Sequence, residues 1–188
     1  QPSPREGRSD AWQHAAMKWA SVLAVLAGVV CAGALFAEPI IGRVVGVADG
    51  DTITVLDALK HQHKIRLSGI DAPEGGQAFG QNSKRALSDC AFGKNATVEG
   101  DKTDRYGRTV GRVVVAGVDC NLRQVELGMA WHYVKYASER PAAESKLYAA
   151  AEVAARAAKR GLWADPNAMP PSDWRAGGQQ AHAAAKES

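Results

Sequence analysis

Cysteine is scarce in this chain of 188 residues, and no cluster of cysteine and histidine has the spacing of a zinc site. A strong excess of charge is also lacking, because 23 basic and 20 acidic residues leave a formal net charge of +3. That balance alone does not indicate a polyanionic partner, so any such attraction must come from local clustering of basic residues. The sequence also has no internal repeat, which excludes a repeat array.

Long apolar runs are absent except for one near the N-terminus. No residue between Trp19 and Ala37 is charged, Met17-Lys18 precedes the run, and small residues end it before Glu38. These features predict a secretory signal peptide, with translation starting at Met17 and the mature protein secreted or periplasmic. A membrane anchor facing away from the cytoplasm is the alternative, because 19 residues just suffice to span a bilayer.

The rest of the chain is long enough for one domain with a buried core. Setting aside the three basic and two acidic residues of 1–37 reduces its net charge to +2. All periodic segments fall within 38–163, which we take as the folded domain. From residue 164 onward proline and glycine are frequent and no apolar face recurs, which predicts an irregular C-terminal tail over 164–188.

Five segments are predicted to be strands, because they are β-branched or alternate apolar with polar residues. They are Ile40–Val47, Thr52–Leu56, His63–Ile70, Ala96–Gly100 and Thr109–Ala116. The period becomes helical over Gln77–Phe92, a short helix is predicted to start at an Asn121 cap with Gln124 in the capping box, and a long one runs from about Pro141 to Arg160. Five strands with a helix after the third outline an α+β fold, a five-stranded OB-fold β-barrel with about three helices.

Three short segments concentrate acidic residues and arginines. They are Asp49-Gly50-Asp51-Thr52, the run from Ile65 to Glu74, and the run from Thr103 to Arg108. Clustered carboxylates are the ligands that a hard cation takes, and arginines bind phosphate through two oxygens at once. Together the segments predict a metal-dependent phosphodiesterase.

In this order and at compatible spacing, the three segments resemble the staphylococcal nuclease (thermonuclease) family from about Ile41 to Trp163. The resemblance implies a nuclease that hydrolyses phosphodiester bonds of DNA and RNA with Ca²⁺. The alternative is a non-catalytic OB-fold module that binds nucleic acid, which loss of the acids or arginines would mark. We predict no stable protein partner, and a membrane partner only if the N-terminal segment stays uncleaved.

The resemblance assigns a metal role to three residues. Asp51 and Asp71 match the two aspartates that bind Ca²⁺ in the family. Ala72 stands where the family has a threonine that ligates through its backbone carbonyl, and an alanine carbonyl can do the same.

The resemblance assigns a catalytic role to three more residues. Arg66 and Arg108 match the arginines that grip the scissile phosphate, where a guanidinium can follow charge as it builds on phosphorus. Glu74 matches the carboxylate that activates or orients the attacking water, and the sequence leaves both of these roles open.

Four further residues are matched to substrate binding. Arg105 and Tyr106 correspond to a lysine–tyrosine pair that contacts the second phosphate of the nucleotide. Tyr133 and Tyr136 fall near the tyrosines that flank the bound base; Tyr136 aligns well, whereas Tyr133 is offset by one residue. A core aromatic is the alternative for Tyr133. A stacked base contributes about 1–3 kcal/mol and tolerates any sequence.

Cys90 and Cys120 remain once Cys31 is removed with the signal peptide. Cys90 falls on the inner face of the first predicted helix, and Cys120 falls just before the second. In an oxidising compartment the pair can form a disulfide, and two separate buried thiols are the alternative.

Overall fold

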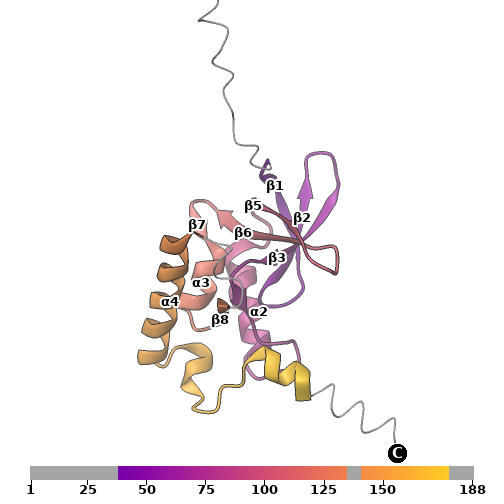
Figure 1. The fold of residues 1–188 in the computed structure, drawn as a ribbon. Coiled ribbons are helices and arrows are strands. Elements are labelled where there is room, and N and C mark those ends of the chain that lie inside the picture. The colour runs from indigo at the N-terminus through magenta and orange to yellow at the C-terminus, as the bar shows by residue number, and fades with distance from the viewer. Residues whose placement is uncertain (1–37, 135–140, 178–188) are drawn as a thin grey trace, which may run out of the picture. The chain divides into compact units, whose positions relative to one another are not determined.

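The computed structural model describes residues 38–134 and 141–177, whose main strands form a mixed barrel (Figure 1). These strands are β1 (Ile40–Val47), β2 (Thr52–Asp57), β3 (Gln62–Leu67), β5 (Asn95–Thr103) and β6 (Thr109–Val115). Neighbours in the order β3-β2-β1-β5-β6 pair antiparallel, and a parallel pairing of β3 with β6 closes the barrel. The predicted α+β OB-fold is confirmed.

Three short strands complete the two sheets. The first, β7 (Val118–Asp119), pairs with β6, and β4 (Ile70–Asp71) pairs with β8 (Trp131–His132). The predicted third strand is therefore two strands, because the chain turns at Gly69, where φ is 68°. This turn separates β3 from β4.

Alternate strand residues fill the interior of the barrel. Side chains from all five main strands are at most 1% exposed there, among them Val44, Ile53, Ile65, Val98 and Val113. β-Branched residues suit a pleated surface with one buried face. A slip by one residue would expose this whole apolar set, so the core fixes the register and with it the polar residues at the strand ends.

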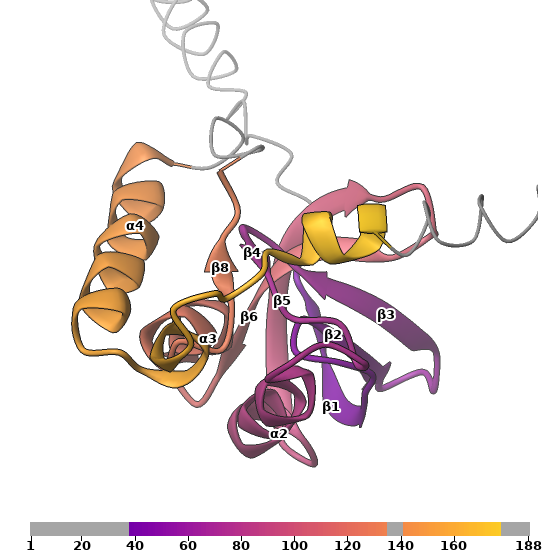
Figure 2. The ribbon, with the colours of Figure 1, turned by 90° about the horizontal axis from the view of Figure 1, so that it is seen from below.

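The described helices lie outside the barrel. They are α2 (Gly80–Ala91), α3 (Cys120–Glu126), α4 (Ala142–Ala157), the 3₁₀ helix η2 (Gly161–Ala164), and residues 171–177. Figures 1 and 2 both show α3 between α4 and the barrel. Buried side chains on α2, α3 and α4 extend the barrel core outward: Leu87, Ala91, Val125 and Tyr148.

Two helices are shorter than predicted, and in each case a left-handed residue sets the limit. Phe79 has φ of 64°, so α2 begins at Gly80 rather than at Gln77. Lys159 has φ of 51°, so α4 ends at Ala157 and does not reach Arg160. A non-glycine residue in this region cannot continue a right-handed helix.

The predicted cap of α3 was wrong. Asp119 is the N-cap, and its side chain accepts a hydrogen bond from the Leu122 N–H at 3.0 Å. Asn121 is fully buried instead, and its amide donates to the carbonyl groups of Ser68 and Gly111 at 3.0 and 3.1 Å. The Asn121 side chain therefore joins β6 to the turn between β3 and β4.

Gln124 is likewise not part of a capping box. Its buried amide donates to the Gly50 carbonyl at 2.6 Å and to the Ser83 carbonyl at 3.0 Å. A Cβ atom at position 50 would overlap the Ser83 hydroxyl, so only glycine fits there. These contacts hold the turn between β1 and β2 against α2 and α3.

Cys90 and Cys120 are joined by a disulfide with a Cα–Cα distance of 6.0 Å. The bond connects the last turn of α2 to the first residue of α3. It therefore reinforces the same helix pair that supports the β1–β2 turn.

The segment after η2 departs from the predicted irregular tail. Residues 171–177 are helical, and the Pro170 carbonyl accepts hydrogen bonds from the N–H groups of Asp173 and Trp174 at 3.1 Å. Pro171 occupies the first turn, where a missing N–H costs nothing and the fixed φ suits a helix. Proline here starts a helix rather than preventing one.

The predicted N-terminal extension and signal peptide or anchor within 1–37 lie outside the described residues, as does the predicted base-flanking Tyr136. Over 38–134 and 141–177, no helix combines the length and the apolar character that crossing a membrane requires.

Candidate functional site

Arg66 lies between two buried aspartates. Its Nη1 is 3.0 Å from Asp51 Oδ2, and its Nη2 is 2.9 Å from Asp71 Oδ1. Asp51 immediately precedes β2, whose Thr52 stands opposite Arg66 in the β2–β3 register. The barrel thus brings together the first acid, the second acid and the first arginine of the predicted site.

The turn at Gly69 explains how Arg66 and Asp71 meet. Five positions apart on a regular strand, the two side chains would point to opposite faces of the sheet. The Arg66 guanidinium also donates to the carbonyl groups of Leu67 and Ile70, both at 3.0 Å. The backbone carbonyl groups of the turn therefore bind the guanidinium. The same turn places the Asp71 side chain within hydrogen-bond distance of it.

Asp51 is 5% exposed and well supplied with donors. Its Oδ2 accepts from the Ala72 N–H at 2.9 Å, and its Oδ1 accepts from the Thr52 hydroxyl at 3.0 Å. Burial nevertheless raises the pKa of Asp51 to about 7, although the Arg66 charge acts to lower it. One guanidinium shared between two acids does not offset the cost of burying this carboxylate.

Arg108 reaches the site from the turn between β5 and β6. Its Nε donates to Asp104 Oδ2 at 2.7 Å, and its Nη1 donates to the Thr52 hydroxyl at 3.3 Å. Asp104 Oδ1 also accepts from the N–H groups of Tyr106 and Arg108 at 2.9 and 3.0 Å, so Asp104 organises the turn. Burial alone would raise the pKa of Asp104, but these hydrogen bonds outweigh it and lower the pKa.

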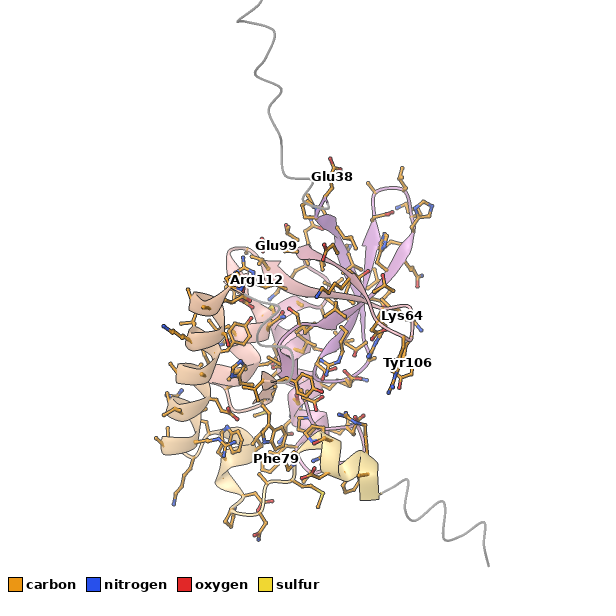
Figure 3. The ribbon with its side chains drawn as sticks, viewed as in Figure 1. Glu38, Lys64, Phe79, Glu99, Tyr106 and Arg112 are labelled. Carbon is orange, nitrogen blue, oxygen red and sulfur yellow. A yellow bond between two sulfur atoms is a disulfide. The ribbon has the colours of Figure 1, made fainter. Side chains whose placement is uncertain are left out.

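Of the remaining substrate-binding candidates, Arg105 and Tyr106 lie in this turn and Tyr133 follows β8. Tyr106 is 67% exposed, and the guanidinium carbons of Arg105 and Arg108 are 4.8 and 5.4 Å from its ring centroid. Figure 3 shows Tyr106 on the side of the barrel away from α4. Tyr133 is half-buried, and its N–H donates to the Gly69 carbonyl at 2.9 Å, beside the turn that carries Asp71.

Glu74 is close to Asp71, and a residue that the sequence did not single out connects the two. Arg175 Nη1 is 2.6 Å from Glu74 Oε1, and its Nη2 is 3.1 Å from Asp71 Oδ2. Sequence reasoning missed Arg175 because the segment around it has no periodic apolar face. The local signal that could have found it is the Pro170-Pro171 pair, which starts a helix rather than an irregular tail.

The oxygen donors at this site suit a hard cation. Asp51 and Asp71 offer carboxylate oxygens beside the backbone of Ala72, and Ca²⁺ takes such ligands together with water. Burial also disfavours the ionised form of Asp51, as its raised pKa indicates, and a bound cation would stabilise that form. Over the described ranges, no group of three or more His, Cys, Asp or Glu side chains is arranged to hold a metal ion. Water and substrate oxygens would have to complete the coordination.

Comparison with known proteins agrees with this geometry. Residues 64–165 match the family described as staphylococcal nuclease homologue. The chain is 44% identical over 133 residues to an uncharacterized endonuclease of Haemophilus influenzae, a match that covers 71% of each chain. It is 40% identical over 144 residues to a micrococcal nuclease of Shigella flexneri, covering 71% of this chain and 79% of that one. The protein ParB of Escherichia coli is 39% identical over 171 residues, covering 86% and 92%.

The barrel and the site define an OB-fold protein with paired acids and arginines on neighbouring strands and turns of the barrel. The chain belongs to the staphylococcal nuclease family.

Proposed function

We propose that this protein is a Ca²⁺-dependent nuclease that hydrolyses phosphodiester bonds of DNA, RNA or both. Family membership and the nuclease names of its relatives support the nuclease activity. The observation that carries the specific proposal is the position of Arg66, bonded to both Asp51 and Asp71. This arrangement provides anionic oxygens for a cation and a guanidinium for a phosphate within one buried cluster.

Asp51, Asp71 and the backbone carbonyl of Ala72 would hold the Ca²⁺. When bound, the cation would supply positive charge that makes a water molecule more acidic and, through a phosphoryl oxygen, makes the phosphorus atom more electrophilic. The protein contributes the rigidity of the ligands. Asp51 is fixed by the Ala72 N–H and the Thr52 hydroxyl, so its carboxylate is oriented before any cation arrives.

Arg66 and Arg108 would bind the scissile phosphate. Asp104 holds Arg108 through Nε, which directs its Nη1 toward Thr52 and so toward the site. The backbone carbonyls of the turn at Gly69 hold Arg66 in a comparable way. Two guanidinium groups fixed by neighbouring protein oxygens can stabilise charge on phosphorus without moving during the reaction.

Glu74 would orient the attacking water or accept its proton. The Glu74 N–H donates to the Gln77 side chain at 3.2 Å, which fixes the backbone of the loop that follows Asp71. The carboxylate shares the Arg175 guanidinium with Asp71, which keeps it near a proposed cation ligand, where water bound by a cation would lie.

Arg105, Tyr106, Tyr133 and Tyr136 would bind the nucleotides on either side of the scissile bond. The exposure of the Tyr106 ring and the two arginines beside it support contact with a phosphate or a base. Binding of this kind is tolerant of sequence, which suits an enzyme that cleaves without strict sequence preference.

A non-catalytic binding module is disfavoured by the site itself. Pure binding needs basic and aromatic residues but no buried acids, because buried acids repel a polyanion. Asp51 and Asp71 are both buried at the position where the phosphate would bind. Burying two carboxylates there costs free energy of folding, which a catalytic use would explain. We also propose export, with Met17–Ala37 as the signal peptide.

Digestion of plasmid DNA and of RNA by the purified protein tests the proposal. We expect cleavage with Ca²⁺, none in the presence of a chelator, and recovery when Ca²⁺ is restored. Equal cleavage with and without chelator would contradict the metal requirement, and no cleavage of either polymer with Ca²⁺ would contradict the activity.

A further inference from the structure

Arg175 is a third arginine at the acidic cluster, and it comes from outside the matched family region, which ends at residue 165. Its two Nη atoms contact different carboxylates, Glu74 at 2.6 Å and Asp71 at 3.1 Å. The contact is thus a fork with one guanidinium nitrogen on each acid.

The segment that carries Arg175 is tied to the loop that carries Glu74. The Gln77 amide donates to the Met169 carbonyl at 2.5 Å, while the Gln77 Oε1 accepts from the Glu74 N–H. One side chain therefore bonds both the catalytic loop and the C-terminal segment. Pro171 is buried, which further limits where the short helix over 171–177 can lie.

Asp71 has both carboxylate oxygens bonded to arginines. Arg66 contacts Oδ1 at 2.9 Å, and Arg175 contacts Oδ2 at 3.1 Å. Glu74, by contrast, contacts Arg175 through Oε1 at 2.6 Å, the shorter of the two Arg175 contacts. A cation that binds Asp71 through Oδ2 must displace the longer contact, and the shorter one to Glu74 can remain.

We propose that Arg175 is a positioning residue of the active site, which holds Glu74 in place and competes with the cation for Asp71. The inference rests on the proposed Ca²⁺-dependent nuclease. A positive charge this close to a ligand weakens cation binding, and the fork to Glu74 fixes the carboxylate that directs water. Arg175 thus keeps the acids paired before the cation binds and orients Glu74 afterwards.

The test compares the variants Arg175→Gln and Arg175→Lys with the unaltered protein. Ca²⁺ affinity is measured by calorimetry without nucleic acid, the melting temperature is measured in chelator, and kcat and KM are measured at saturating Ca²⁺. For Arg175→Gln we expect Ca²⁺ to bind about tenfold more tightly, because a competing charge is gone. We expect kcat to fall about 10–100-fold with little change in KM, because Glu74 loses its partner.

Arg175→Lys separates charge from geometry. Lysine keeps the positive charge, so we expect the Ca²⁺ affinity of Arg175→Lys to be near that of the unaltered protein. Because lysine cannot bond two carboxylates with a fork, we expect its kcat to lie between those of the unaltered protein and Arg175→Gln. Arg112→Gln is the matched control, because Arg112 also bonds two acids, Glu99 at 2.9 Å and Asp119 at 3.6 Å. Figure 3 shows it beside Glu99, and it has no contact with Asp71 or Glu74 among the described ion pairs. We expect Arg112→Gln to leave Ca²⁺ affinity and kcat unchanged.

Three results would overturn the role of Arg175 while leaving the nuclease intact. They are an Arg175→Gln variant with unchanged Ca²⁺ affinity and kcat, one in which Ca²⁺ binding weakens together with activity, and one in which only KM rises. The second would indicate that Arg175 merely supports the fold, and the third that it binds substrate. An unaltered protein that neither binds Ca²⁺ nor cleaves would overturn the proposed function and this inference together.

Discussion

Asp51 is the residue whose environment most clearly indicates a use beyond stability. It is buried, hydrogen-bonded and adjacent to an arginine, yet its pKa is raised to about 7 by burial. A carboxylate kept for stability alone would have its pKa lowered by such partners. The folded protein therefore bears a cost for ionising Asp51, which a bound cation would remove.

The pH dependence of stability follows from this shift. Since the pKa of Asp51 is higher in the folded chain than its ordinary value of 3.8, its ionisation costs no stability below pH 3.8 and the full cost above about pH 7. Asp51→Asn mimics the protonated acid. In chelator at pH 8 we expect the variant to melt at least about 2–4 °C higher, the shift for ~1 kcal/mol.

The same comparison at pH 5 is the control, because pH 5 lies between the two pKa values of Asp51 and only part of the cost of ionising it is then present. We expect the difference between the two melting temperatures to be clearly smaller than at pH 8. A difference that is the same at both pH values, or a variant that melts lower at pH 8, would refute the raised pKa.

At the scale of elements, the turn between β3 and β4 decides whether the site forms. Gly69 has φ of 68°, a conformation that costs an L-residue roughly 1–2 kcal/mol. Gly69→Ala should therefore lower the free energy of unfolding by about that amount. We also expect it to reduce cleavage, because the turn aligns Asp71 with Arg66.

Gly117→Ala is the control for this variant. Gly117 has φ of 81°, and a Cβ atom added there would meet no other atom within 4 Å, so alanine meets the same backbone strain away from the site. We expect a similar loss of stability by chemical denaturation and no loss of cleavage. Equal activity in the two variants would show that the turn does not align the site.

The disulfide between α2 and α3 is a second prediction at this scale. Replacing Cys90 and Cys120 by serine should lower the free energy of unfolding by about 2–4 kcal/mol, as expected for a closed loop of this length. Denaturant unfolding of both forms measures the change. Mass spectrometry that finds two free thiols in the non-reduced protein would contradict the bond.

The elements of the barrel were predictable because their signal is local. The bounds of β1 matched, since β-branched residues flank a strong turn signal at Asp49-Gly50. The division of the third strand was not predictable from alternation, because it depends on the conformation of a single glycine. The role of Asn121 also escaped, since an asparagine before a helix suggests a cap whereas tertiary contacts bury its amide.

The site was predictable in part for the same reason. Asp51, Arg66 and Asp71 lie in motifs, and the barrel brings them together. Arg175 lies 101 positions from Glu74 in the sequence, and no local pattern marks it. Contacts of that range are set by packing of the whole domain and cannot be read from one segment.

At the scale of the whole molecule, export is the prediction that concerns the ends of the chain. The apolar run ends at Ala37 and the described strands begin at Ile40, so we expect a mature N-terminus near Glu38. N-terminal sequencing of the exported protein measures it. A terminus upstream of Trp19 would reject cleavage and favour the anchor.

The central claim is that two acids bind a cation and that other residues of the site act on the phosphate and the water. Cleavage and Ca²⁺ binding, measured together on one substrate for Asp51→Ala, Glu74→Gln and Arg108→Ala, test it most directly. We expect Asp51→Ala to lose Ca²⁺ affinity and cleavage together. Glu74→Gln and Arg108→Ala should still bind Ca²⁺ but lose turnover, by about 10²–10³ for the arginine. Cleavage unchanged in both Asp51→Ala and Arg108→Ala would contradict the assigned site.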